Sequence, residues 1–60
     1  MNTYIVSWES KSGVARLKCF DRRESAQNYA HKTRRATGAE IKIEVRDERY
    51  RLVRADYING

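Results

Sequence analysis

The sequence contains no proline and has one cysteine, one histidine and three glycines. Because Cys19 is the sole cysteine, a disulfide within the chain is excluded. With His31 as the sole histidine, a zinc site built from cysteine and histidine in one chain is excluded too. A glycine-rich phosphate loop is absent, and the longest apolar run is far too short to span a bilayer. With no secretory leader at Met1, these absences predict a cytoplasmic protein without a cofactor or membrane contact.

Residues for catalysis are equally sparse. A nucleophile needs a base within hydrogen-bond reach, and that base is usually histidine. We expect His31 on the solvent side of a helix, opposite Ala26 and Ala30, and Cys19 as a buried, inert thiol. Acidic residues are interleaved with arginine as in surface ion pairs, and no carboxylate pair stands apart for acid–base chemistry. The sequence therefore predicts a protein that is not an enzyme.

Length and charge limit what the chain can bury and bind. Sixty residues form a single domain, 1–60, whose core rarely supplies more than about 3–5 kcal/mol without further support. With disulfide and zinc excluded, self-association is the remaining support, so a homodimer is expected. The net charge is +5, and nine of the thirteen cations are arginine. This excess favours nucleic acid or an acidic protein surface as partner, although solubility alone explains it equally well.

One segment, Asp21 to Gly38, has the pattern of a helix. Asp21 is a good N-cap residue, and Glu24 completes a capping box. Gly38 stands where a helix-terminating glycine belongs. Residues at helical spacing form one narrow, mostly small face: Ala26, Tyr29, Ala30, Thr33 and Thr37.

The flanking segments are rich in β-branched and aromatic residues and are typical of strands. We expect strands over 3–8, 14–20, 39–46 and 50–55, with polar turns over 9–13 and 46–49. In the last segment Tyr50, Val53 and Tyr57 also lie at helical spacing, so a helix over 47–57 is the alternative. Residues 57–60 are expected to form a short, frayed tail.

This β-β-α-β-β order predicts an α+β, two-layer domain with one helix packed on an antiparallel sheet. The apolar alternates of each strand are expected to face the helix, with Tyr29 buried against Ile41 and Ile43. The predicted core is Tyr4, Val6, Trp8, Ala15, Leu17, Ala26, Tyr29, Ala30, Ile41, Ile43, Val45 and Leu52.

The other face of the sheet is then expected to be basic. A nucleic-acid-binding site is predicted there, because cations among aromatic side chains suit phosphate and base contact; Phe20 and Tyr57 are available for stacking. Its predicted cations are Arg16, Lys18, Lys42, Arg46 and Arg51. A second basic patch is predicted on the helix from Arg23, Arg34 and Arg35, although the helix dipole explains the last two about as well.

Two surfaces are candidates for the homodimer. One is the edge of the 50–55 strand. The other is an apolar strip on the open sheet face that a second chain would cover: Ile5, Val14, Phe20 and Val53.

As a whole the chain resembles the small orphan proteins encoded in the early regions of lambda-like bacteriophages. The shared features are the opening Met1-Asn2-Thr3 directly before a strand, the absence of proline, and the basic helix start Asp21-Arg22-Arg23-Glu24. The resemblance implies a non-enzymatic accessory of host machinery or phage development and assigns no functional residue. The leading expectation is a regulatory protein that binds nucleic acid through the basic sheet face. The alternative is a protein-interaction module that inhibits or adapts a host protein.

Overall fold

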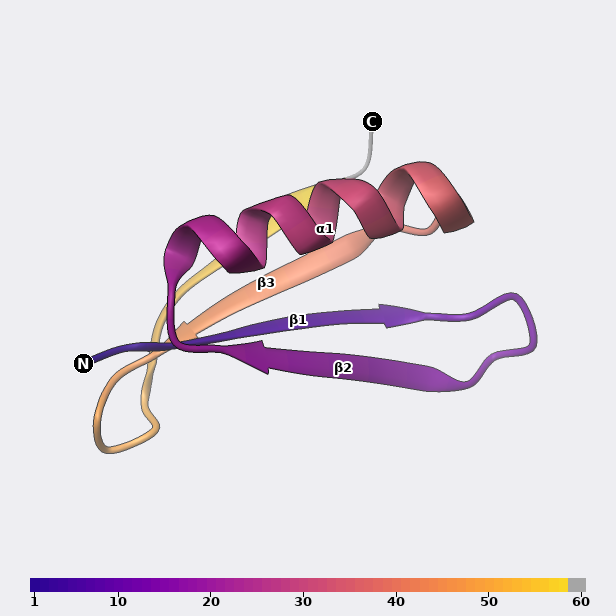
Figure 1. The fold of residues 1–60 in the computed structure, drawn as a ribbon. Coiled ribbons are helices and arrows are strands. Elements are labelled where there is room, and N and C mark those ends of the chain that lie inside the picture. The colour runs from indigo at the N-terminus through magenta and orange to yellow at the C-terminus, as the bar shows by residue number, and fades with distance from the viewer. Residues whose placement is uncertain (59–60) are drawn as a thin grey trace.

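A single helix lies across one face of a four-stranded antiparallel sheet in the computed structural model, which describes residues 1–58 (Figure 1). The elements are β1 (Thr3–Glu9), β2 (Ala15–Phe20), α1 (Arg23–Thr37), β3 (Ile41–Arg46) and β4 (Leu52–Ile58). The strand order β2-β1-β3-β4 joins two hairpins through their first strands, so β2 and β4 are the edges. The predicted α+β, β-β-α-β-β fold is confirmed, and the last segment is a strand rather than a helix.

Helix α1 is shorter than predicted at its start. Its N-cap is Arg22, which has extended backbone and makes no side-chain capping bond, so the predicted Asp21 cap is wrong. At the other end Gly38 adopts the left-handed conformation with φ 73°, and its N–H donates to the Arg34 carbonyl at 2.8 Å. This glycine terminates the helix as the sequence predicts, because a residue with a side chain is strained there.

The register of the strands decides which side chains face the helix. Residues paired across neighbouring strands point to the same face, and Val6, buried under α1, pairs with Ile43 on one side and Lys18 on the other. Strand β2 therefore turns Arg16, Lys18 and Phe20 toward the helix side. The prediction that its other alternates face the helix is wrong: Ala15, Leu17 and Cys19 lie on the open face.

The core is centred on β1, β3 and the small residues of α1. Its buried members are Val6, Ala26, Ala30, Ile41 and Ile43, and half-buried residues pack around them: Tyr4, Trp8, Phe20, Tyr29, Ala39 and Ile58. Ile5 is buried as well, but on the open face, where it pairs with Cys19 and Glu44. Leu17 and Leu52 are 67% and 52% exposed, and Ala15 is exposed, so these three predicted core residues are wrong. The sequence interpretation missed Phe20 and Ile58, whereas Ile5 lies on the open face as predicted. The Cys19 thiol is exposed rather than buried.

Strand β4 continues beyond its predicted end. Ile58 pairs with Ile41 and Tyr57 with Lys42, so the predicted frayed tail is wrong for both residues, and Asn59 and Gly60 lie outside the described residues. The β1–β2 turn and the β3–β4 turn lie at opposite ends of the molecule (Figure 1). Within residues 1–58 the one helix is too short and too polar to cross a membrane.

Candidate nucleic-acid interface

The five cations of the predicted sheet-face site do not share a surface. Lys42 and Arg46 lie on the open face, because they alternate with the helix-facing residues of β3. Arg16 and Lys18 lie on the helix side, paired with Trp8 and Val6. Arg51 precedes β4 in the turn after β3. The predicted single basic face is therefore wrong, and the cations fall into separate groups.

The open-face cations share one carboxylate. Glu44 Oε2 lies 3.5 Å from Lys42 Nζ and 3.0 Å from Arg46 Nη2. Arg46 also donates to the Tyr50 carbonyl at 3.3 Å, and its guanidinium carbon lies 5.3 Å from the centroid of the Tyr50 ring. Because these contacts hold Arg46 against the β3–β4 turn, its side chain has little freedom to follow a phosphate backbone.

Arg51 is engaged in the same turn. Its Nε donates to Asp47 Oδ2 at 3.2 Å. Asp47 Oδ1 accepts the backbone N–H groups of Arg51 and Arg49, each at 2.9 Å. These bonds, with the Arg51 N–H first, lower the pKa of Asp47 below its ordinary value, because they stabilise the ionised carboxylate. Arg51 is thus a structural partner of an acidic residue in the turn.

Strand β2 differs from these cases. Arg16 and Lys18 are exposed and have no carboxylate partner in the described part of the chain. Lys18 Nζ lies 5.3 Å from the ring centroid of Tyr29 and 5.9 Å from that of Phe20. Its aliphatic stem runs over aromatic surface while the ammonium stays in water.

Three aromatic side chains form the base of this region. The Tyr29 ring, from α1, lies 5.9 Å from the Trp8 ring and 5.3 Å from the Phe20 ring, tilted by 54° and 49°. Such tilted contacts are favourable between rings at this separation. We call the set Trp8, Arg16, Lys18, Phe20 and Tyr29 the β2 patch.

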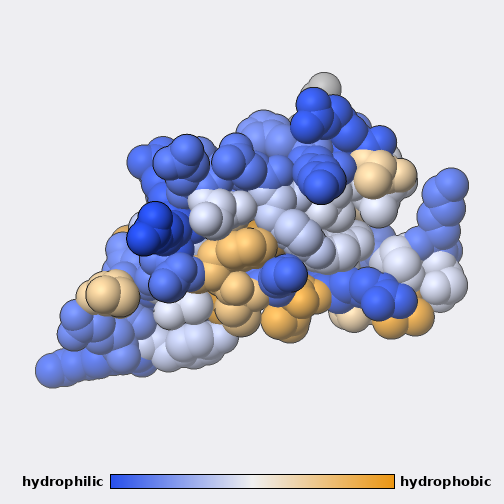
Figure 2. Space-filling view, in the orientation of Figure 1, coloured by the Kyte–Doolittle hydropathy of each residue, from blue (hydrophilic) through white to orange (hydrophobic). Residues whose placement is uncertain are grey.

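The β2 patch continues into a hollow at the C-terminal end of α1. The hollow has a volume of about 680 Å³. Its wall contains Trp8, Arg16 and the acidic Glu9, together with Ser10 and Lys11 of the β1–β2 turn and residues 36–39. Figure 2 shows hydrophilic residues over the top of α1 and hydrophobic residues gathered beneath it, with hydrophilic side chains among them. Cations and an aromatic ring thus border one concave surface.

The predicted helix patch is not one patch either. Arg23 opens α1, whereas Arg34 and Arg35 lie in its last turn, about 16 Å away at 1.5 Å per residue. Arg34 donates to the Gly38 carbonyl, as expected of a cation at a helix C-terminus. The first turn and the last turn therefore present separate cations.

Sequence reasoning missed the grouping of Arg16 and Lys18 with the three rings. One feature of the sequence does point to it: Phe20 is the largest residue of its strand and is followed after two residues by α1. In the structure the Phe20 side chain does face that helix, and its ring lies 5.3 Å from the Tyr29 ring. Because side chains alternate, Lys18 and Arg16 then follow Phe20 onto the same face.

The described residues contain no group of three or more histidine, cysteine, aspartate or glutamate side chains that could hold a metal ion. The β2 patch instead brings cations and aromatic rings together on one surface. The resemblance to small phage proteins stays a prediction. Comparisons with protein-family models, with curated proteins and with solved structures found no match to this chain.

Proposed function

We propose that the protein is a small, non-enzymatic accessory that binds nucleic acid through the β2 patch. One observation carries the proposal: Arg16 and Lys18 have no carboxylate partner within residues 1–58 and lie beside three aromatic rings. Lys42, Arg46 and Arg51, in contrast, are each paired with an acidic residue.

The chemistry of the β2 patch suits an unpaired strand. Phosphates are attracted by Lys11, Arg16 and Lys18, and bases stack on aromatic faces regardless of their sequence. Trp8 is half-buried and borders the hollow, which leaves part of its ring for a base. A base within a duplex is already stacked on its neighbours. We therefore expect single strands to bind more tightly than duplexes of the same length.

The fluorescence of Trp8 measures this binding directly, because Trp8 is the only tryptophan. We expect oligothymidylate to quench it at low salt. Contacts from Lys11, Arg16 and Lys18 predict a log–log salt slope of about −2 on single strands, from about −0.7 per phosphate. Replacing Arg16 and Lys18 with alanine removes about 1.4 units of that slope.

The matched control is the double variant Lys42→Ala and Arg49→Ala, which removes the same charge from other surfaces. It should leave the slope unchanged within error. Arg46 is unsuitable as a control because its contacts stabilise the β3–β4 turn. Equal losses in the two double variants would mean that net charge alone, rather than the β2 patch, attracts the strand.

The rival function is a protein-interaction module, and the position of β2 favours it. β2 is an edge strand, so the N–H and C=O groups on its outer side have no neighbouring strand. An extended segment of another protein can pair with such an edge, and the exposed Leu17 offers an apolar contact on the open face. If oligothymidylate and duplex both fail to quench Trp8 at low salt, this function replaces nucleic-acid binding.

A further inference from the structure

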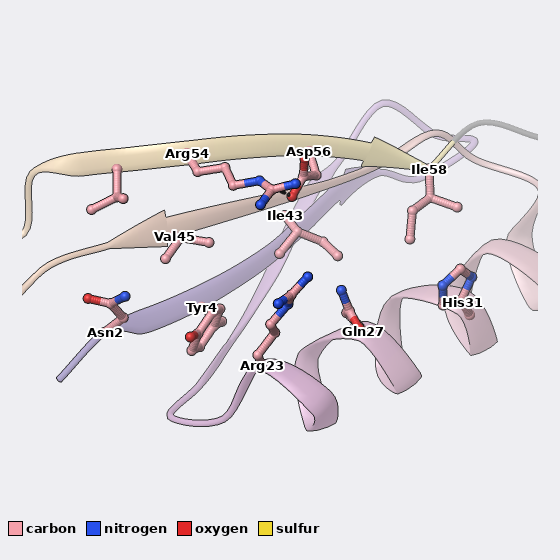
Figure 3. Close-up of a pocket in the computed structure, with 11 residues that line it drawn as sticks. Asn2, Tyr4, Arg23, Gln27, His31, Ile43, Val45, Arg54, Asp56 and Ile58 are labelled. Atoms are coloured by element: carbon pink, nitrogen blue, oxygen red, sulfur yellow. Dashed lines mark ion pairs between the residues drawn. The ribbon is translucent and has the colours of Figure 1, made fainter.

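A groove runs between α1 and β4, on the side of the helix away from the β2 patch. It encloses about 390 Å³. Tyr4, Ile43 and Val45 form its floor, and β4 contributes Arg54, Asp56 and Ile58. Strand pairing places these β4 side chains on the helix side, since Val45 pairs with Arg54 and Ile43 with Asp56. The groove exists because β4 is the edge strand beyond the part of the sheet that α1 covers (Figure 3).

The helix wall of this groove is a row of hydrogen-bond donors. Arg23, Gln27 and His31 follow one another at intervals of four residues and therefore lie along one line of α1. Figure 3 shows their side chains directed toward the space between helix and sheet. The side chains of these three residues have no hydrogen bond or ion pair with another described residue.

The opposite wall is an ion pair. Arg54 Nε lies 2.9 Å from Asp56 Oδ2, and the side chains are 61% and 45% exposed. The terminal nitrogens of Arg54 have no other partner among residues 1–58. With histidine neutral, the charges of Arg23, Arg54 and Asp56 sum to +1. The groove thus has an apolar floor, hydrogen-bond donors on both walls and a net charge of +1.

From this combination we propose that the groove binds a small organic monoanion: a carboxylate carried by an aromatic or apolar body. The body would lie on Tyr4, Ile43 and Val45, and the carboxylate would accept hydrogen bonds from Arg23 and the free nitrogens of Arg54. A single carboxylate neutralises the net charge of +1 in the groove, whereas a dianion would leave it with a net negative charge. The volume is in the range of small-ligand sites, which combine apolar walls with a few polar groups.

Naphthoate is a suitable probe, and naphthamide is its neutral match of nearly the same shape. In an amide NMR titration of the whole chain, naphthoate should shift the backbone signals of Gln27, His31, Arg54 and Ile58. Naphthamide should bind about tenfold more weakly or worse, because a hydrogen bond to a charged acceptor is lost. Equal binding of the two compounds, signals that move at β2 instead, or no shift at millimolar naphthoate would overturn the proposal.

Paired variants separate this groove from a general effect of charge. Arg23→Gln should weaken naphthoate binding about tenfold, whereas Arg22→Gln, one residue earlier and outside the groove, should not. Asp56→Asn should strengthen it, because Arg54 is released and a repelling charge is removed. Circular dichroism should show all three variants folded. An identical loss in the Arg22 and Arg23 variants, or weaker binding in the Asp56 variant, would contradict the assignment.

Discussion

At the scale of the residue, Tyr29 joins the helix to the β1–β2 hairpin. It is half-buried, and its ring contacts are with Trp8 and Phe20, whereas the sequence predicted burial against Ile41 and Ile43. The prediction was wrong because it assumed that β2 turned its apolar alternates, Ala15, Leu17 and Cys19, toward the helix. Once Phe20 occupies that face, the space beside Ala26 and Ala30 is filled by an aromatic cluster.

Replacing Tyr29 with alanine should lower the free energy of unfolding by about 2–3 kcal/mol, from lost apolar burial and two ring contacts. This is less than the roughly 3–5 kcal/mol lost at a fully buried aromatic. The thermal midpoint should fall by at least about 8 °C in a domain of this size. Lys32→Ala, at an exposed position of the same helix, is the control and should shift it little. An unchanged midpoint in Tyr29→Ala would show that the ring cluster adds nothing to stability.

Single residues also explain why the binding surface was predicted on the wrong face. In β2 one alternate set, Ala15, Leu17 and Cys19, is apolar but has one large member, Leu17, whereas the other has a large ring and two long cations. Hydrophobicity favours the first set, and volume favours the second. Volume won: the Phe20 ring packs with the Tyr29 ring of the helix, and the Lys18 side chain lies against both rings while its charge reaches water.

At the scale of the element, helix α1 and strand β3 were predictable because the sequence pattern of each fits only one kind of secondary structure. The alternation of Ile41, Ile43 and Val45 with charged residues fits only a half-buried strand. The extent of β4 was less predictable. Tyr57 and Ile58 belong to the strand because they pair with Lys42 and Ile41 of β3. Pairing across strands is a tertiary interaction, and the local sequence pattern of residues 57–60 does not predict it.

The β3–β4 turn makes a prediction about acid stability. The pKa of Asp47 is lowered in the folded state, chiefly by the N–H of Arg51. Its contribution to stability is therefore fully present above the ordinary pKa of 3.8 and is lost as the pH falls through the lower pKa of the folded state. Asp47→Asn should be less stable than the parent at neutral pH. The difference should shrink between about pH 5 and pH 2.

Chemical unfolding at a series of pH values measures this effect. Asp21→Asn is the matched control, because Asp21 makes no capping bond and lies outside the turn. Its stability difference from the parent should not follow the pattern of Asp47→Asn. A constant difference between Asp47→Asn and the parent down to pH 2 would mean that the carboxylate charge has no part in the turn.

At the scale of the whole molecule, the acidic residues divide the surface. The ion pairs of β3, β4 and their turn neutralise cations there, while β2 and the β1–β2 turn keep Lys11, Arg16 and Lys18 without carboxylate partners among the described residues. The excess of cations that gives the net charge of +5 therefore lies mainly away from the open face. A prediction from composition cannot locate this asymmetry, because it depends on which side chains the strand register brings together.

The open face of the sheet is the remaining large surface without a covering layer. The apolar strip predicted there is wrong in part, since Phe20 faces the helix and Val53 borders the α1–β4 groove. Its large exposed apolar residues are instead Leu17 on one edge strand and Leu52 and Tyr57 on the other, 67%, 52% and 56% exposed. The row Lys42, Glu44 and Arg46 lies between them and carries both signs of charge. Such a surface suits a second copy of the chain.

We expect the protein to form a dimer through this face, because a total of six buried apolar residues gives a small domain little stability of its own. Sedimentation equilibrium at micromolar concentration should show the dimer, and the thermal midpoint should rise with protein concentration. Leu17→Glu combined with Leu52→Glu should give a folded monomer, because it places charge on both apolar edges of the face. Val14→Glu makes the same change at an exposed apolar residue of the β1–β2 turn and should leave the dimer intact. A parent chain that sediments as a monomer and unfolds independently of concentration would show that the open face is a solvent surface.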